Sequence, residues 1–346
     1  MKKQLLTMLL AGSMLAASAM PAFAGETETE ASAPEGIQAS EEFYKNADLA
    51  SLKGKKIGIT IQSLQNAYWA GVMSALEDVL KENGAEYTIL ACDDNSNTQI
   101  GQIENFISSG CDLIMVHPSD AAAVEDSCKT AREAGIKVMC WDDPMENTDA
   151  DWVLDNTYLG EEIGKLAGKF INEHYSADNK AQVALITYDQ TVVLLERKNG
   201  IKKGLEESAA GNYDIVAEQP GLDPAQAQTS METILQANPD CKVAVGIGAG
   251  AMIGANEAFM TYYNYDIPED VGVITTDVTK QQLNSILADE ACRGIIGFEG
   301  SDLDTATACA SMYAMILDGS LKDHIVYRAV APITTDNAEK ILGEMK

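Results

Sequence analysis

Short apolar runs alternate with longer segments of helical period from about residue 55 onward. One series of runs covers residues 57–61, 87–92, 113–116 and 138–141, and a second covers 183–186, 215–217, 243–247, 271–274 and 295–298. A helical pattern such as Trp69, Met73, Leu76, Val79 and Leu80 lies between two runs and ends at Gly84. This alternation builds parallel sheets with helices on both faces. We therefore predict an α/β fold.

The series is interrupted at residues 142–155, an acidic stretch that contains Pro144 and has no clear helical period. One open sheet of all these strands would be unusually wide. Two doubly wound parallel sheets, one in each of two lobes, with the chain crossing near Asn156, are the simpler arrangement. In such sheets ligands bind beyond the carboxyl ends of the strands. The residues that directly follow each apolar run are therefore the candidates for a site.

The N-terminal residues have the pattern of a secretory signal peptide. Lys2 and Lys3 precede an apolar stretch at residues 5–20, and an Ala-x-Ala site predicts cleavage after Ala24. A membrane anchor is disfavoured because the apolar run is short and ends in small residues. Residues 25–53 are rich in Glu, Ala, Ser and Thr, which predicts an acidic flexible stalk. We expect residues 1–24 to be removed and the protein to reside in the periplasm or at the outer face of the cytoplasmic membrane.

Charge and cysteine content exclude several classes of partner. The formal net charge is −29 and becomes −31 without the two lysines of the signal peptide. This charge argues against binding to nucleic acid or anionic lipid. The seven cysteines are odd in number, form no Cys-x-x-Cys, and accompany three histidines that are far apart in sequence. We predict buried thiols, with no disulfide framework, no metal site and no cofactor.

Polar and aromatic residues cluster after several of the predicted strands. Carboxylates and amides bind vicinal hydroxyl groups, and aromatic rings cover the C–H face of a sugar. The alternative is that each Asp or Asn only caps the following helix, which for a single residue is the simpler hypothesis. Taken together, these residues favour a ligand site: Gln62, Asn66, Tyr68 and Trp69 after the first run, Asp142 and Asp143 after the fourth, Asp277 after the run at 271–274, and Phe298 at the end of the last.

A family resemblance covers nearly the whole chain, from about residue 55 to 337. Its marks, in order, are KIGI at 56–59, LQNAYW at 64–69, IENFISSGCD at 103–112, HPSD at 117–120, GIKV at 135–138, DN at 155–156 and ERKNG at 196–200. The chain resembles the ribose/galactose-type (type I) periplasmic solute-binding proteins of ABC sugar transporters. The resemblance implies three hinge strands near Asn156, Glu299 and Arg328. It implies a first lobe of residues 54–157 and 300–328 and a second of 158–299 and 329–346.

The resemblance also implies roles for the candidate residues. Asn66 would bind sugar hydroxyls, Tyr68 and Trp69 would stack on the ring, and Asp142 and Asp277 would be the acceptors from the two lobes. The chain departs from the family's sugar pattern at four positions: Asp143 and Leu195 replace arginines, Gly248 an asparagine and Phe298 a glutamine. A less polar or deoxy sugar, a polyol or a furanosyl signal molecule therefore fits as well as ribose or galactose.

The expected function is that of an exported, monomeric solute-binding protein, not an enzyme. It would close about its hinge on a sugar or polyol and deliver it to the permease of an ABC transporter; presentation to a chemoreceptor is an alternative. The glycine run at 246–251, with Asp266 downstream, partly matches a dinucleotide fingerprint, but it comes late in the chain and a second helix separates it from Asp266. A sugar-responsive repressor would need a helix-turn-helix headpiece, and this sequence has a signal peptide and an acidic stalk in its place. A hydrolase of the Gly-x-Ser-x-Gly type is excluded because the sequence lacks that motif.

Overall fold

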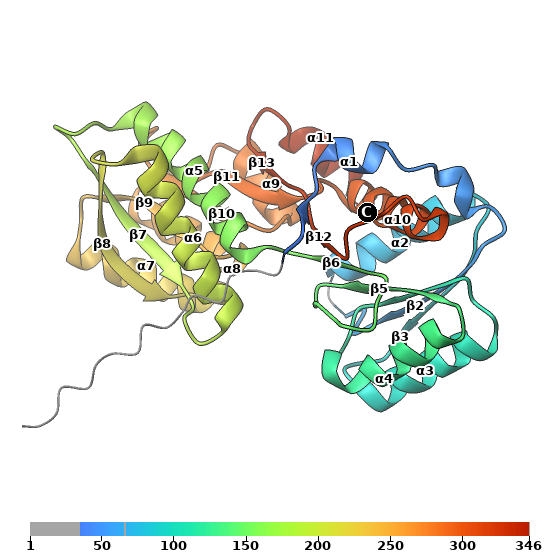
Figure 1. The fold of residues 1–346 in the computed structure, drawn as a ribbon. Helices are drawn as coiled ribbons and strands as arrows, with labels where there is room; N and C mark the ends of the chain where they lie inside the picture. The colour runs from blue at the N-terminus through green and yellow to red at the C-terminus, as the bar shows by residue number, and fades with distance from the viewer. Residues whose placement is uncertain (1–34, 66, 346) are drawn as a thin grey trace, which may run out of the picture. The chain divides into compact units, whose positions relative to one another are not determined.

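A computed structural model of the protein describes residues 35–65 and 67–345. The predicted signal peptide and residues 25–34 of the predicted stalk lie outside these residues. The described chain forms two open sheets, each covered by helices (Figure 1). No helix within the described ranges is both long enough and apolar enough to cross a membrane.

The first sheet is parallel throughout and has the strand order β1-β12-β6-β5-β4-β2-β3. All four residues of β4 are buried, as expected for a central strand that helices cover on both faces. The strands of this sheet are β1 (Ile37–Gln38), β2 (Lys56–Ile61), β3 (Glu86–Ala91), β4 (Leu113–Val116), β5 (Lys137–Trp141), β6 (Ala150–Val153) and β12 (Ile325–Tyr327).

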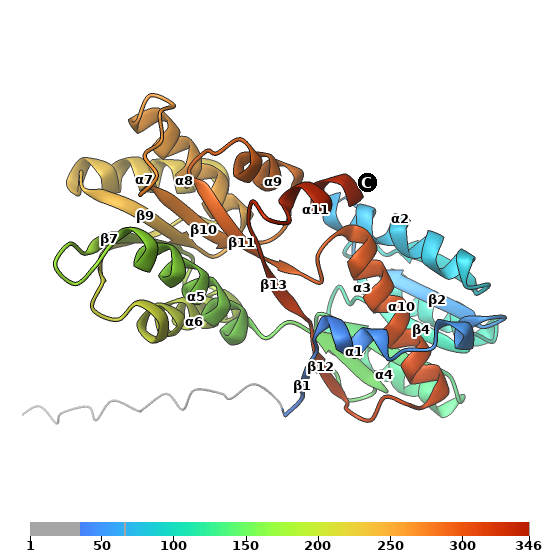
Figure 2. The same ribbon diagram turned by 90° about the horizontal axis from the view of Figure 1, so that it is seen from above.

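Two separate cores lie on the two faces of the first sheet. On one face, Leu76, Trp152 and Tyr313 belong to a core that α2 (Ala67–Glu82), α10 (Asp302–Asp318), α1 (Glu41–Lys45) and η1 (Leu49–Leu52) build together. Helices α2 and α10 lie side by side in this layer (Figure 2). On the other face, α3 (Ser96–Ser108) and α4 (Ala121–Glu133) contribute Phe106 and Val124 to the second core.

The second sheet has the order β13-β11-β10-β9-β7-β8, and only the pair β11–β13 is antiparallel. Its strands are β7 (Ala181–Thr187), β8 (Tyr213–Pro220), β9 (Cys241–Gly246), β10 (Gly272–Thr276), β11 (Cys292–Phe298) and β13 (Val330–Ile333). One face is covered by α5 (Asn156–His174) and α6 (Val192–Ala209), and the other by α7 (Pro224–Ala237), α8 (Ala249–Tyr262), α9 (Lys280–Leu287) and α11 (Ala338–Glu344). The predicted α/β fold with two doubly wound lobes is confirmed.

The chain passes between the two sheets three times, after β6, after β11 and after β12. Backbone hydrogen bonds join the crossing segments: the amide of Arg328 donates to the carbonyl of Val153 at 2.8 Å, and that of Glu299 to the carbonyl of Ala329 at 3.0 Å. Every predicted strand is present in the structure. The hydrophobic pattern missed β1, β6, β12 and β13, because each has only two to four residues and gives little periodic signal.

The prediction of a flexible stalk is wrong for residues 37–52. Strand β1 pairs in parallel with β12, with Ile37 opposite Val326. Tyr44 and Leu52 are buried in the first core. The composition of this segment is polar on average, but a few apolar residues anchor it to the lobe. Their burial offsets the conformational entropy that is lost when the segment becomes ordered. Order therefore begins well before Lys55.

All seven cysteines are buried and unpaired, as predicted. Burial raises the pKa of the thiols of Cys128, Cys241 and Cys292 to about 12. A thiol that stays protonated is a poor nucleophile and a poor metal ligand. These cysteines therefore act as small apolar side chains of the cores.

The hydroxyl group of Tyr44 gives a test of the N-terminal segment. It accepts a hydrogen bond from Nε1 of Trp152 at 2.8 Å and donates to Oε1 of Glu299 at 3.4 Å. Tyr44→Phe should lower the free energy of unfolding by about 1–3 kcal/mol, because buried polar partners lose their hydrogen bonds. Urea denaturation measures the loss. Tyr262→Phe, at an exposed tyrosine, should have little effect, and equal stability of both variants would contradict the assignment of residues 37–52 to the lobe.

Candidate ligand-binding site

Three residues that directly follow strands have left-handed backbone conformations. Asp142 follows β5 with φ 75°, Asp277 follows β10 with φ 74°, and Glu299 follows β11 with φ 51°. Residues other than glycine adopt this conformation at a cost, which is smaller for Asp and Asn, and such strain concentrates at functional sites. Both predicted carboxylate anchors, one from each sheet, thus share the same unusual backbone.

The carboxylate of Asp142 lies between two nitrogen donors. Oδ2 is 3.6 Å from Nε2 of His117, and Oδ1 is 3.5 Å from Nη1 of Arg328. Nδ1 of His117 accepts from the amide of Gln62 at 3.4 Å, which assigns the ring proton to Nε2. Burial lowers the pKa of His117, although Asp142 opposes this shift. Burial thus favours the neutral form of His117, whose Nε2 faces the carboxylate of Asp142.

Both predicted stacking residues, Tyr68 and Trp69, contact other side chains of the protein. Trp69 is 9% exposed and stacks on His117 with ring centroids 4.1 Å apart. The hydroxyl of Tyr68 accepts a hydrogen bond from Nη2 of Arg328 at 2.7 Å, and burial raises its pKa to about 12. Their stacking on a sugar ring stays a prediction. Asn66 lies outside the described residues.

Three other predicted site residues, Gln62, Asp143 and Phe298, have partners of several kinds. Nε2 of Gln62 donates to Oδ1 of Asp94 at 2.8 Å. Burial raises the pKa of Asp143, and the neighbouring carboxylates of Asp142 and Asp120 add to the shift. Phe298 lies at the end of β11 in the second sheet, with its ring centroid 5.4 Å from the guanidinium carbon of Arg328. The structure therefore brings Tyr68, Asp142 and Phe298 together around one arginine.

That arginine and its partner Glu299 were predicted only as markers of the hinge. The side chains of Arg328 and Glu299 are 3% and 2% exposed, and Nη2 lies 2.7 Å from Oε2. The guanidinium carbon also lies 5.3 Å from the ring centroid of Trp141 and 4.8 Å from that of Trp152. Applying the strand-end argument to β12 would have identified Arg328 as a site residue. The three-residue strand was too short to be recognised.

The residues near Asp277 lie around the N-terminus of α8. Oδ2 of Asp277 accepts a hydrogen bond from the amide of Ala249, the first residue of α8, at 2.7 Å. The N-cap position itself is Gly248, whose missing side chain cannot satisfy this amide. Asp277, which follows β10, therefore caps α8, the helix that follows β9. The alternative that Asp277 caps the helix that follows it is wrong, because Thr279 is the N-cap of α9. The second carboxylate oxygen of Asp277 makes no hydrogen bond within the described ranges.

Arg197, from the ERKNG motif, lies beside this group. Its Nε and Nη2 donate to Oδ1 of Asn156 at 3.2 and 2.7 Å, and its Nη1 donates to the carbonyl of Ile247 at 2.6 Å. Burial lowers the pKa of Arg197 and the charge of Asp277 opposes this. Gly160 permits the arrangement, since a Cβ there would lie 2.1 Å from the carbonyl oxygen of Arg197. The close contact between α5 and α6 thus fixes Arg197 near the start of α8.

The glycine run at 246–251 has a packing explanation. A Cβ at Gly250 would lie 2.1 Å from the carbonyl oxygen of Leu222, just before α7 begins. Glycine is required there because α8 passes close to the backbone of another segment. Close packing against the backbone of Leu222 therefore accounts for Gly250 without a bound dinucleotide.

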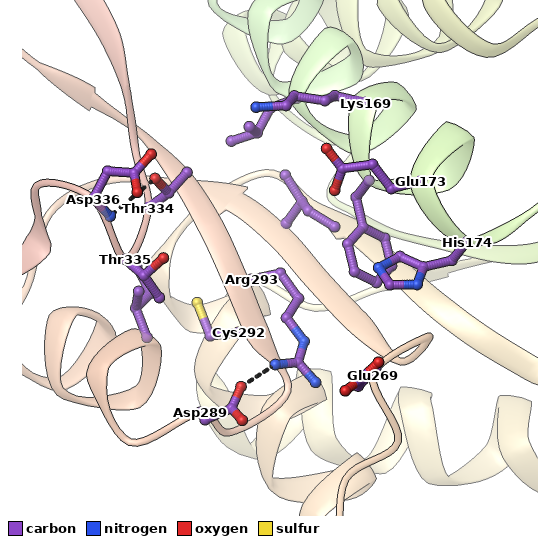
Figure 3. A pocket seen from close by; sticks show the side chains of 14 residues that line it. Lys169, Glu173, His174, Glu269, Asp289, Cys292, Arg293, Thr334, Thr335 and Asp336 are labelled. Atoms are coloured by element: carbon purple, nitrogen blue, oxygen red, sulfur yellow. Dashed lines mark hydrogen bonds and ion pairs between the residues drawn. The ribbon is translucent and has the colours of Figure 1, made fainter.

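A cavity of about 400 Å³ lies elsewhere in the second lobe, near the first residues of β11 (Figure 3). It is lined by both cations and anions, among them Lys169, Glu173 and Arg293. Arg293 donates to Asp289 and to the carbonyl of Val271. Because ligands of such sheets bind at the carboxyl ends of the strands, we do not assign the site to this cavity.

Comparison with known proteins identifies the family. The sequence profile of the periplasmic binding protein domain matches residues 57–321. The chain belongs to this family. It is 24% identical over 248 residues to the ribose import binding protein RbsB of Bacillus subtilis (strain 168), which covers 71% of this chain and 77% of the relative.

Two further similar proteins are consistent with this family assignment. The D-xylose-binding periplasmic protein of Escherichia coli (strain K12) is 27% identical over 192 residues, which are 55% of this chain and 57% of that protein. The crystal structure of a periplasmic ribose ABC transporter from Conexibacter woesei DSM 14684 superposes with a TM-score of 0.69 at 18% identity, covering 84% of this chain and 96% of that one. This structural likeness supports the two-lobed fold.

Substitutions at Asp277 separate its capping role from its backbone role. Asp277→Ala should lower the free energy of unfolding by about 1–2 kcal/mol, because it removes the cap of α8 and places alanine in a left-handed conformation. Asp277→Asn keeps an acceptor and tolerates this conformation, so its loss should be smaller. Asp93→Ala, at an exposed residue with φ 49°, measures the backbone contribution alone. Thermal melting of the three variants decides; equal melting of wild type and Asp277→Ala would remove Asp277 as the cap.

Proposed function

We propose that the protein is an exported solute-binding protein that captures a sugar or a sugar-like polyhydroxylated molecule and delivers it to the permease of an ABC transporter. The observation that carries this proposal is the pair of strained carboxylates, Asp142 and Asp277, at the carboxyl ends of strands in the two sheets. The ribose- and xylose-binding relatives support a solute of this class.

The chemistry around the two aspartates suits hydroxyl groups. Asp142 supplies a carboxylate acceptor that is 35% exposed, and His117 presents an N–H donor beside it. Hydroxyl groups both donate and accept, so they can satisfy an acceptor and a donor that lie side by side. Hydrogen bonds to a carboxylate are stronger than those between neutral groups. We assign Gln62, Asn66, Tyr68, Trp69, Asp142 and Asp143 to the half-site of the first lobe, and Asp277 and Phe298 to that of the second.

The proposed mechanism is closure about the three crossing segments. The first lobe would comprise residues 54–157 and 300–328, extended by residues 37–52, and the second 158–299 and 329–346. A solute that contacts Asp142 and Asp277 together would bind the closed form more tightly than the open form. Such differential affinity is what shifts the population between two conformations.

A ligand screen tests the proposed solute class. D-ribose, D-xylose, D-glucose and myo-inositol are the probes, and a probe present at a hundredfold excess over its dissociation constant should stabilise the fold by about 2.7 kcal/mol. Thermal shift measures this effect, and mass spectrometry identifies any solute that co-purifies. Asp142→Asn should abolish or reduce the shift, whereas Asp93→Asn should not. A protein that neither responds to any of the four probes nor carries a polyhydroxylated solute would contradict the proposal.

Small-angle scattering tests the closure. Addition of the probe that gives the largest thermal shift should reduce the radius of gyration, because the solute holds the two lobes together. The Asp277→Asn variant at the same probe concentration is the control and should show a smaller reduction. Identical scattering profiles with and without a saturating probe would rule out the hinge mechanism while leaving solute binding intact.

A further inference from the structure

The guanidinium group of Arg328 has one nitrogen without a hydrogen bond in the part of the chain that the structure describes. Nε and Nη2 both donate to Oε2 of Glu299, at 3.1 and 2.7 Å, and Nη2 also donates to the hydroxyl of Tyr68. Nη1 lies 3.5 Å from Oδ1 of Asp142, beyond the usual length of such a bond. Nη1 therefore keeps hydrogen-bonding capacity that an oxygen acceptor of a ligand can use.

The surrounding structure holds this donor in place. The side chain of Arg328 is 3% exposed, and the ring centroids of Trp152 and Phe298 lie 4.8 and 5.4 Å from its guanidinium carbon. Glu299 fixes the opposite edge of the guanidinium group. Asp142, in contrast, is 35% exposed. A fixed donor therefore lies next to a carboxylate that a solute can reach.

We propose that Nη1 of Arg328 and the carboxylate of Asp142 together bind a single neutral hydroxyl group, which makes Arg328 a specificity-determining residue. This inference rests on the proposed function as a sugar-binding protein. Because Nη1 and Oδ1 are 3.5 Å apart, one oxygen can lie about 2.8 Å from both atoms. Its hydrogen is donated to Oδ1 of Asp142, and its oxygen accepts from Nη1 of Arg328. A deoxy carbon at this position satisfies neither group.

The charges around the pair select against anionic solutes. Asp143 and Asp120 add carboxylates near Asp142, and their mutual repulsion contributes, after burial, to the raised pKa of Asp143. Burial lowers the pKa of His117, which disfavours a positive charge there. The charge of Arg328 is already balanced by Glu299. A sugar acid such as D-xylonate should therefore bind more weakly than D-xylose.

Arg328→Lys tests the assignment. Lysine keeps a positive charge beside Glu299, but its single nitrogen cannot hold Glu299 and also replace Nη1. Calorimetry with D-ribose, D-xylose, D-glucose and myo-inositol should show the dissociation constant of each bound probe rising about ten- to a hundredfold. The matched control is Arg293→Lys, at an arginine of the second lobe that is paired with Asp289, and it should leave affinity unchanged.

A double-mutant cycle tests whether one hydroxyl serves both residues. Asp142→Asn alone should weaken binding, and Asp142→Asn combined with Arg328→Lys should be little weaker than the worse single variant, because both remove the same bridge. Losses that multiply would overturn the shared hydroxyl. Unchanged affinity in a folded Arg328→Lys variant would overturn the role of Arg328 and leave the proposed function standing.

Folding and ligand class are controlled separately. If Arg328→Lys does not fold, Glu299→Gln combined with Arg328→Met, which removes both buried charges together, replaces it with the same expected loss of affinity. Equal affinity of the wild-type protein for D-xylose and D-xylonate would also overturn the inference. Failure of the wild-type protein to bind any of the four neutral probes would overturn the proposed function and this inference with it.

Discussion

The buried ion pair of Arg328 and Glu299 joins the segments on which both lobes depend. Arg328 lies on the third crossing between the sheets and Glu299 on the second, and the amide of Arg328 is bonded to Val153 at the first. Leaving one member of such a pair unpaired costs about 3–5 kcal/mol, because a charge would remain in an apolar environment. The pair therefore holds the three crossing segments in one arrangement.

This arrangement is costly and is compensated by dense contacts. Burial alone would lower the pKa of Arg328, but the charges of Glu299 and Asp142 raise it above its ordinary range. Aromatic rings cover the guanidinium faces, and Tyr44 donates to the second oxygen of Glu299. The residues around this ion pair come from both sheets, from α2 and from the N-terminal segment. Any movement of the crossing segments must therefore keep or exchange these contacts together.

The two proposed half-sites use the same strand-end position in different ways. Asp142 is flanked by the side chains of His117 and Arg328, whereas Asp277 is fixed by the amide that begins α8. Both aspartates have left-handed backbones at the carboxyl ends of parallel strands. One half-site thus draws its donors from side chains, and the other from the N-terminus of a helix. The strand ends themselves are alike. The difference arises because different elements lie next to each strand end.

The sequence by itself determined the long strands, the two-sheet organisation and the position of Asp142 and Asp277 at strand ends. Central strands covered on both faces are almost continuously apolar, so β2, β4, β5, β7, β9, β10 and β11 were visible as runs of such residues, and the edge strands β3 and β8 as shorter apolar stretches. Only the tertiary structure decided that residues 37–52 belong to the first lobe and that Arg328 meets Asp142. Strand β1 exists because it pairs with β12, and Arg328 is buried because Glu299, Tyr68 and three aromatic rings surround it. These contacts join residues far apart in the chain, and local composition carries no signal of a partner that only folding brings near.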